Sequence, residues 1–562
     1  MDNYLKTFLL HLQDNEFKPD ETKTRWTGSV FVEWKDAETG DLQGAKHTIA
    51  ICLLKGFPYR APVIYAIDEP TLTTSWHLNP DTPPSLCLWD SERGWQPDFT
   101  AHKLLNRAHD WFYHYHTNSW PPNSQLPDLH LYLDPIGIVA IGDEWPPTSE
   151  AFSGTFRLWR PKYKNTPYLA SCHENKTEPE PRLAETMVLG ANLPQIRGVW
   201  FRVPQPFVPP NRLDNLLQQI DAVAKAPPGK SYKNCVASVS RKTTDGFPIA
   251  IGYPDNQGEE RWLFLWGQPP KRKQKRFLWS SVPGISQVEI KSFQTAPAGK
   301  EALLKRTAYV SKSLTNCRII LFGVGSLGSS IALLLAKAGV SALRLIDNDH
   351  LMPVNVMRHV CGLNHVGATK TKALKSVIRQ HNPDCLTDFL PSAWDREQLR
   401  DYMSGYDLVI DATGNTNFSR YLNGICVELN QPVLFTATYR KARIGRIVMR
   451  LNSDAPCLEC YLAHPEEWAE TDYPTIPLNP NEGFIEDGCG SVTEEAVALD
   501  MEAVANFAAR QAIKILNNQH NGANLAMLVN EPLLDADNEI FHTANARFWT
   551  NKPHSDCLVC KT

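Results

Sequence analysis

The second half of the chain alternates short apolar runs with amphipathic runs, and this alternation limits the possible folds more than any other feature. Strands are predicted at 318–322, 342–347, 408–411 and 433–438, and helices at 326–337, 371–381 and 418–429. Strands that alternate with helices pair in parallel, and the helices cover both faces of the sheet. The sequence therefore predicts a doubly wound α/β domain over residues 301–562.

A glycine-rich loop joins the first of these strands to the first helix. Gly323, Gly325 and Gly328 have the G-x-G-x-x-G spacing between a strand and a helix, the context that this motif requires. Glycines let the backbone approach a phosphate, and the helix start offers free N–H groups. Asp347 closes the second strand, where a carboxylate can bind a ribose hydroxyl. These residues predict a nucleotide site without separating NAD from ATP.

The residues that follow separate the two nucleotides. Asp349 precedes Asn355 and Arg358, and Lys370 comes three residues after Gly367. This string resembles the signature of the ThiF/MoeB-type adenylating enzymes, which activate ubiquitin and sulfur-carrier proteins with ATP. The resemblance implies a Rossmann-like domain and assigns Asn355, Arg358 and Lys370 to the ATP phosphates. Such cations stabilise the charge that develops on departing pyrophosphate, a role that a dehydrogenase does not need.

One position departs from the family pattern. The family usually shows Asp-x-Thr-Asp-Asn after the fourth strand, and its second aspartate meets magnesium. Here the string is Asp411-Ala-Thr-Gly414-Asn415, so the second carboxylate is missing. We therefore expect Asp411 or another group to meet Mg²⁺; the alternative is that adenylation is impaired.

Five cysteines of this domain stand in chemically suggestive positions. Cys457-x-x-Cys460 and Cys557-x-x-Cys560 each offer two thiolates, and four sulfurs suit a closed structural Zn²⁺ site. Cys489 lies in a glycine turn ahead of a helix predicted over 504–516, and a thiolate near a helix start is nucleophilic. In the resembling enzymes a cysteine in the corresponding stretch takes the acyl group from the adenylate as a thioester.

The N-terminal part carries a second cysteine motif. Strands are predicted at 25–34, 46–54 and 63–67 and a helix at 104–115, with a long proline-rich loop at 69–98 between them. Within that loop, His77 and Asn79 precede Cys87. The segment resembles the active site of ubiquitin-conjugating enzymes, with a leucine in place of the central proline of their His-Pro-Asn motif. The resemblance implies an α+β conjugating domain over residues 1–135, with Asn79 as the oxyanion donor and Cys87 as the acyl acceptor.

The two halves together resemble bacterial fusions of conjugating and activating domains found in anti-phage cyclic-oligonucleotide (CBASS) systems. The resemblance implies a relay. ATP adenylates a protein's C-terminal carboxylate, Cys489 takes the acyl group, Cys87 receives it by transthiolation, and a target amine accepts it. The activated protein would be a cGAS-like nucleotidyltransferase or a ubiquitin-like modifier, and the enzyme would be a homodimer. Alternatives are a sulfur-carrier-activating enzyme of cofactor synthesis, which leaves Cys87 without a task, and a decayed binding scaffold.

The bulk properties fit this reading. A chain of 562 residues should divide into roughly three domains, and residues 136–300 are predicted as a mixed α and β middle domain of unknown role. A net charge of −4 does not favour nucleic acid, and the basic run 271–276 is predicted to be a solvated loop. No membrane span or export signal is evident, so a cytoplasmic protein is expected. The seven remaining cysteines are expected to be mostly buried, inert thiols.

Overall fold

The structure of the chain is a computed structural model. It describes residues 2–68, 77–79, 85–89, 94–120, 129, 133, 135–143, 145, 152–159, 168–171, 195–207, 209–224, 231–240, 246–255, 258–269, 286–463, 484–485, 492–493, 495–531, 533–534, 540–542 and 545–560. The chain forms two compact units. Met1–Glu180 and Val188–Pro297 make up the first, and Ala298–Thr562 lies in the second.

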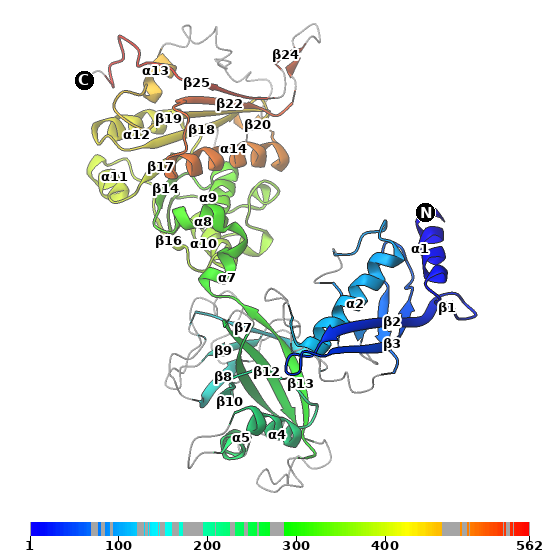
Figure 1. Cartoon of the computed structure of the whole chain (residues 1–562). Coiled ribbons are helices and arrows are strands. Elements are labelled where there is room, and N and C mark those ends of the chain that lie inside the picture. The colour runs from blue at the N-terminus through cyan, green and yellow to red at the C-terminus, as the bar shows by residue number, and fades with distance from the viewer. Residues whose placement is uncertain are drawn as a thin grey trace. The chain divides into compact units, whose positions relative to one another are not determined.

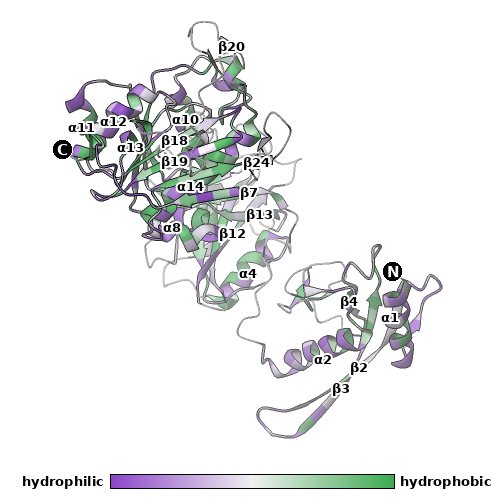
Figure 2. Cartoon of the chain, turned by 90° about the horizontal axis from the view of Figure 1, so that it is seen from above, coloured by the Kyte–Doolittle hydropathy of each residue, from purple (hydrophilic) through white to green (hydrophobic). Residues whose placement is uncertain are grey.

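The first unit begins with a helix, a sheet and a second helix. Its elements are α1 (Asp2–Asp14), β1 (Lys18–Pro19), β2 (Arg25–Lys35), β3 (Leu42–Cys52), β4 (Val63–Ala66), β5 (Leu78–Asn79), β6 (Ser85–Leu86) and α2 (Ala101–Thr117). Strands β1 to β4 form an antiparallel sheet in chain order, and β5 pairs with β6. The three predicted strands are therefore present, with ends shifted by up to four residues. Both hydrophobic and hydrophilic residues occur along α2, which packs its buried side chains on the sheet (Figure 2).

The middle region contains a closed seven-stranded barrel, which the sequence did not reveal. Its strands are β7 (Pro135–Ile141), β8 (Ser153–Trp159), β9 (Tyr168–Ser171), β10 (Gln195–Arg202), β11 (Phe247–Pro254), β12 (Glu260–Gln268) and β13 (Glu289–Pro297), in the order β10-β11-β12-β13-β7-β9-β8. Two helices, α4 (Leu213–Val223) and α5 (Tyr232–Ser240), accompany them.

Both faces of the central barrel strands are buried, and this explains their weak sequence signal. On β12, Leu263 and Leu265 join a core shared with α4 and α5, whereas Trp262, Phe264 and Trp266 join an aromatic cluster to which all seven strands contribute. Strands buried on both faces lose the alternation of polar and apolar residues that normally identifies them. Glycine makes room for these rings, because a Cβ at Gly198 would lie 2.4 Å from the Phe156 ring.

The second unit is built on one large sheet with helices on both faces (Figure 1). Its strands are β14 (Arg318–Phe322), β15 (Ala342–Ile346), β16 (Leu386–Leu390), β17 (Leu408–Asp411), β18 (Val433–Tyr439), β19 (Ile444–Arg450), β22 (Leu525–Val529) and β25 (Asn545–Trp549). Its helices are α7 (Lys300–Leu304), α8 (Ala308–Leu314), α9 (Ser326–Ala338), α10 (Lys370–His381), α11 (Arg396–Met403), α12 (Thr416–Glu428), α13 (Leu458–Ala463) and α14 (Ala498–Leu516). Two small hairpins are also present, β20 (Phe484–Ile485) with β21 (Val492–Thr493) and β23 (Leu533–Leu534) with β24 (Ile540–His542). Three short 3-10 helices, η5 (Lys305–Thr307), η6 (Pro353–Asn355) and η7 (Leu363–His365), complete the described elements of this unit.

The predicted parallel α/β arrangement of this unit is confirmed. The order is β16-β15-β14-β17-β18-β19-β22-β25, parallel from β16 to β18 and antiparallel beyond. Alternate residues of β14 point to opposite faces: Ile319 and Leu321 pack with α9, α10 and α14, and Ile320 and Phe322 pack with α11 and α12. The three antiparallel strands were not predicted, because their pairing depends on contacts distant in sequence.

The strand order reverses between β14 and β17. From β14 the chain moves to β15 on one side, and it later returns to β17 on the other. In open α/β sheets, ligands bind outside the carboxyl ends of the strands at such a switch point. The loops after Phe322 and Asp411 are therefore the place to look for a site.

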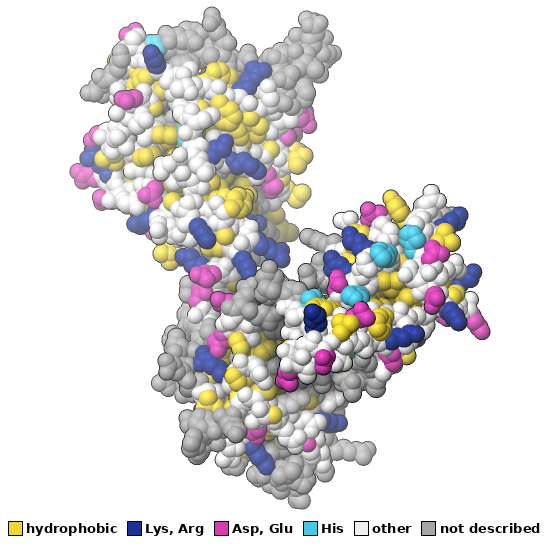
Figure 3. Space-filling model, viewed as in Figure 1, with side chains coloured by type: hydrophobic (Ala, Val, Ile, Leu, Met, Phe, Trp, Pro, Cys, Tyr) yellow, Lys and Arg dark blue, Asp and Glu magenta, His cyan; other side chains and the backbone are white. Residues whose placement is uncertain are grey.

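On the face shown in Figure 3, the charged side chains of the described residues are of mixed sign, with basic and acidic groups interspersed. Among the residues that the structure describes, no helix combines the length and apolar character needed to cross a bilayer. The basic run at 271–276 lies outside the described residues.

Candidate functional site

The glycine-rich loop lies where the strand order reverses. Gly323 has a φ of +82°, and a Cβ there would lie 2.6 Å from the Thr413 Cα atom. A Cβ at Gly328 would lie 1.9 Å from the Gly323 carbonyl oxygen, so α9 can approach the loop only with glycine at this position. Gly325 is the residue before the first turn of α9, and no atom would obstruct a Cβ there. Gly323 and Gly328 are thus required by the close packing around the loop, whereas the space around Gly325 is open.

Asp347 organises this loop. One carboxylate oxygen, Oδ2, accepts a hydrogen bond from the Val324 N–H at 2.7 Å, and Oδ1 accepts one from the Asp349 N–H at 2.8 Å. The side chain predicted to bind a ribose hydroxyl therefore links the ends of β14 and β15.

A hollow of about 310 Å³ lies beside the loop and contains several predicted residues. Gly323, Gly325, Asp347, Asp349 and Lys370 line it. The Lys370 Nζ atom lies 2.8 Å from the Asp349 Oδ2 atom, and the lysine side chain is 13% exposed. The structure therefore places a cation and two carboxylates around this hollow.

Arg358 lines a second hollow of about 510 Å³. Gly325, Ala412 and Thr413 line both hollows, so the two spaces adjoin along one wall. The wall of the second hollow further includes Tyr439 and Arg446, whose guanidinium lies 4.9 Å from the Tyr439 ring centre.

Asn355 shapes the turn that carries Arg358. Its side-chain oxygen accepts a hydrogen bond from the Met352 N–H at 3.0 Å, and its carbonyl accepts one from the Arg358 N–H at 2.9 Å. The predicted phosphate ligand thus has a local structural task, and its role toward phosphate stays a prediction.

Asp411 lies at the end of β17, and its carboxylate is already engaged. Oδ1 accepts hydrogen bonds from the Thr413 N–H at 3.0 Å and from the Thr413 hydroxyl at 2.7 Å, and Oδ2 accepts one from the Ser419 hydroxyl. Burial raises the pKa of Asp411, and the bonds from Ser419 and Thr413 oppose that rise. Gly414 has a φ of +67° and open space at its Cβ position.

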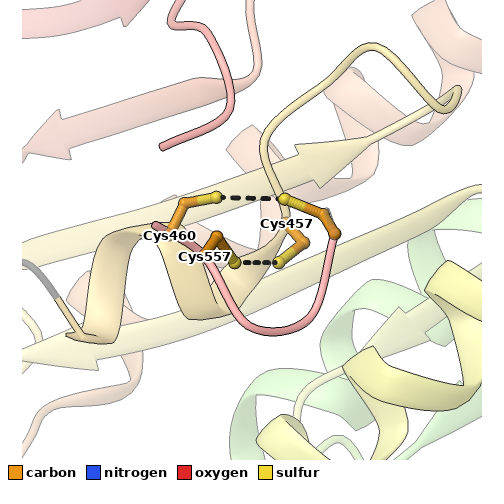
Figure 4. A group of neighbouring side chains, drawn as sticks. Cys457, Cys460 and Cys557 are labelled. Carbon is orange, nitrogen blue, oxygen red and sulfur yellow. Dashed lines mark hydrogen bonds between the residues drawn. The ribbon is translucent and has the colours of Figure 1, made fainter. Parts of the chain in front are cut away.

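The two cysteine pairs converge although they are a hundred residues apart. The Cys457 and Cys557 sulfur atoms are 3.7 Å apart, those of Cys460 and Cys560 are 3.4 Å apart, and all four lie within 4.8 Å of one another. Figure 4 shows the three labelled cysteines pointing toward one another. Disulfide sulfurs would be about 2.0 Å apart, whereas the sulfurs of a Zn²⁺ tetrahedron with bonds of about 2.3 Å are about 3.8 Å apart.

The backbone around the cluster suits thiolate ligands. The His554 N–H donates to the Cys460 sulfur at 3.4 Å, and the Cys460 N–H donates to the Cys457 carbonyl. Burial raises the pKa of the Cys560 thiol to about 11, so this thiol stays protonated unless a cation stabilises its charge. The residues therefore fit a structural metal ion.

Cys87 follows the β5–β6 hairpin and is half-buried. Its N–H donates to the His77 carbonyl at 2.9 Å, and that carbonyl accepts a second bond from the Trp111 indole at 2.8 Å. The Asn79 amide donates to the Ser85 hydroxyl at 3.0 Å and to the Leu86 carbonyl at 3.3 Å. Burial lowers the pKa of His77 to about 4, and nearby His114 adds to the effect. The hairpin thus brings His77, Asn79 and Cys87 together, with His77 neutral near pH 7.

The remaining predictions concern Cys489 and the cysteines expected to be inert. Cys489 and Cys172 lie outside the described residues. Of the other cysteines expected to be inert, Cys361, Cys385 and Cys426 are buried. Cys52, Cys235 and Cys317 are only half-buried.

Trp394 and His359 are among the residues at the site that the sequence did not reveal. Trp394 lines the first hollow and is 58% exposed, unusual for a tryptophan, with its ring edge-on to Phe418 at 5.3 Å. His359 is buried and contacts the glycine-rich loop. The only signal for His359 was its position next to Arg358, and Trp394 had none, because its segment follows a strand that the sequence did not reveal.

Comparison with known proteins agrees with the prediction of a ThiF/MoeB-type domain in the C-terminal part of the chain. Residues 299–559 match the ThiF family. The chain is 23% identical to the uncharacterized protein y4oA of Sinorhizobium fredii over 80% of each chain. It is 29% identical to the adenylyltransferase and sulfurtransferase MOCS3 of Caenorhabditis briggsae, over 31% of this chain and 42% of that protein. The SAMP-activating enzyme E1 of Haloferax volcanii is 25% identical, over 44% of this chain and 81% of its own length.

The overlap with the sulfurtransferase relatives is partial. The chain spans about half the length of the MOCS3 and UBA4 proteins that it matches, between 42% and 52% for the first three. Among solved structures, E. coli MccB with ATP aligns with a TM-score of 0.34 and 19% identity, over 45% of this chain and 68% of that one. The ThiF match over residues 299–559 falls within the second unit, which contains the parallel sheet and the glycine-rich loop.

Proposed function

We propose that the second unit adenylates the C-terminal carboxylate of a protein with ATP. One observation carries the proposal: the two hollows adjoin at Gly325, Ala412 and Thr413. ATP occupies the first hollow, and a carboxyl-terminal tail enters the second. A carboxylate oxygen attacks the α-phosphorus, an acyl adenylate forms, and pyrophosphate leaves. Arg358 and Lys370 stabilise the charge on the departing group.

We further propose that Mg²⁺ binds at this site without a second aspartate. Proteins commonly hold Mg²⁺ through one or two carboxylates together with substrate phosphates. Asp411 faces the second hollow, and Asp349 lines the first with 69% of its side chain exposed. These two residues would hold the ion, which would neutralise phosphate charge.

The experiment is ATP–pyrophosphate exchange by the full chain in the presence of its protein substrate. Lys370→Ala is expected to lower the exchange rate by about 100- to 1000-fold, the range found when one charge-stabilising group is lost. Lys372→Ala is the matched control, because that exposed lysine lies two residues along the same helix and outside both hollows. Equal rates for the two variants would contradict the proposal.

The finer proposal is a conjugation relay. The adenylated protein passes to Cys489 and then to Cys87, and a target amine receives it. The hairpin supports the second step, because its Asn79 amide bonds the carbonyl of Leu86, the residue before the half-buried Cys87, and transfer requires a thiol with an amide donor near it. The activated protein is a CBASS cGAS-like nucleotidyltransferase or a ubiquitin-like modifier, as the sequence resemblance implies.

Sulfur-carrier activation is the second candidate. The names of the MOCS3 and UBA4 relatives favour it, since both are adenylyltransferases and sulfurtransferases. It leaves the Cys87 hairpin without a task. A Cys87 variant that retains every protein-modifying activity of the wild type would favour this candidate.

A homodimer through the 352–366 segment is also proposed. This segment carries exposed apolar side chains beside Arg358, among them Met357, 83% exposed, and Leu363, 71% exposed. Exposed apolar clusters mark interaction surfaces. Met357→Glu is expected to shift the chain from dimer to monomer in analytical ultracentrifugation. Leu386→Glu, at a 76% exposed position on β16, is the control and should leave the dimer intact.

A further inference from the structure

His359 connects the segment of Arg358 to the glycine-rich loop. It is 8% exposed; its Nε2 lies 2.9 Å from the Val324 carbonyl oxygen, and its Nδ1 lies 3.1 Å from the Cys361 backbone nitrogen. The Cys361 N–H can only donate, so Nδ1 must accept. The ring proton therefore lies on Nε2 and is donated to Val324.

Val324 is consequently held on both sides. Its N–H donates to the Asp347 carboxylate at 2.7 Å, and its carbonyl accepts from His359. In a planar trans peptide the carbonyl and the following N–H point in opposite directions. Fixing the Val324 carbonyl therefore fixes the direction of the Gly325 N–H, at the residue that lines both hollows.

The loop has reason to need such a constraint. Glycines on either side of Val324 give the backbone a freedom that other residues lack, and Gly325 has open space around its Cβ position. A mobile loop would have to be ordered each time phosphate binds, at a cost in affinity and rate. Because His359 follows Arg358 directly, the same contact also ties that arginine to the loop.

We propose that His359 is a positioning residue that holds the glycine-rich loop and Arg358 in one arrangement for nucleotide activation. The proposal rests on the adenylation function proposed above. It predicts that the bond to Val324, rather than the bond to Cys361 or the bulk of the ring, sustains ATP binding and exchange.

The surroundings keep the imidazole neutral. Burial lowers the pKa of His359, and Lys370 and His365 add to this effect, whereas the bond to Val324 and the Asp347 carboxylate oppose it. Protonation would place a hydrogen on Nδ1, where the Cys361 N–H points. The folded state thus favours the neutral ring, and the arrangement is lost only as the pH falls through this lowered pKa.

Two variants separate the two hydrogen bonds. In His359→Gln, the amide nitrogen reaches the position of Nε2 and keeps the bond to Val324. The asparagine side chain of His359→Asn is shorter. Its amide oxygen takes the position of Nδ1 and keeps the bond from the Cys361 N–H, but the bond to the Val324 carbonyl is lost. ATP affinity by calorimetry, kcat and KM for ATP–pyrophosphate exchange, and thermal unfolding are measured for both.

The Gln variant is expected to stay within about 3-fold of wild type, and the Asn variant to lose about 10- to 100-fold in kcat, a magnitude typical of small misplacements. The two variants should unfold at similar temperatures. Equal losses in both variants, or no loss in either, would overturn the proposal. If the wild type binds ATP but shows no exchange, the proposed adenylation fails instead, and the ATP affinities of the two variants still decide the role of His359.

Discussion

Replacing Cys87 with alanine is expected to abolish transfer of the activated protein to any amine, while the adduct on the second unit persists. In the relay, the acyl group moves from the Cys489 thioester to the Cys87 thiol before an amine attacks it. Without Cys87, the product amide should fall below detection, and a thiol-labile adduct should accumulate on Cys489. Non-reducing gels and intact mass spectrometry of the chain incubated with ATP and its protein substrate would show both effects.

Two further variants locate each step of the relay. Cys489→Ala should carry no thioester but keep ATP–pyrophosphate exchange, because adenylation precedes the thiol. Cys52→Ala is the control for Cys87, since Cys52 is another half-buried cysteine of the same unit, and it should behave as wild type. An amide product formed by Cys87→Ala at the wild-type rate would rule out the relay and favour sulfur-carrier activation.

Replacing Cys557 with alanine is expected to cause the largest loss of stability. The four sulfurs lie at separations suited to one tetrahedral ion. Structural zinc contributes about 10–16 kcal/mol in zinc-finger peptides at pH 7, far more than the roughly 0.5–3 kcal/mol of ordinary substitutions. A loss of only about 3 kcal/mol would lower the unfolding temperature of a domain of this size by about 6–12 °C.

Cys385→Ala is the matched control for this measurement. Cys385 is 3% exposed and Cys557 is 4% exposed, but Cys385 lies outside the cluster. Both variants lose one buried sulfur, and only Cys557→Ala should also lose bound zinc, measured by elemental analysis of the purified chain. A wild-type chain without stoichiometric metal, or equal unfolding temperatures for the two variants, would contradict the metal site.

The ThiF-type domain was largely predictable because its signals are local. One short stretch of sequence contains the strand that ends at Phe322, the glycines after it and the helix that follows. Each of these could be predicted from its own residues. Apolar runs predicted four of the five parallel strands. The fifth, β16, was missed because it contains the exposed Leu386 and the polar Asp388 and so lacks an apolar run. The family resemblance predicted that Arg358 and Lys370 lie beside the nucleotide, and each of them lines a hollow that Gly325 also lines.

Tertiary structure decided what depends on contacts distant in sequence. The barrel closes only when β13 pairs with β7 and β8 pairs with β10. Its central strands β11 and β12 are buried on both faces, so they lack the alternation of polar and apolar residues that identifies a strand. The Thr413 and Ser419 bonds that occupy Asp411, and the imidazole that holds Val324, likewise follow from packing. Sequence thus predicted which residues would carry the chemistry, because backbone geometry and spacing are written locally. Folding alone determined their orientation, because buried polar groups must find partners wherever the packed chain brings them.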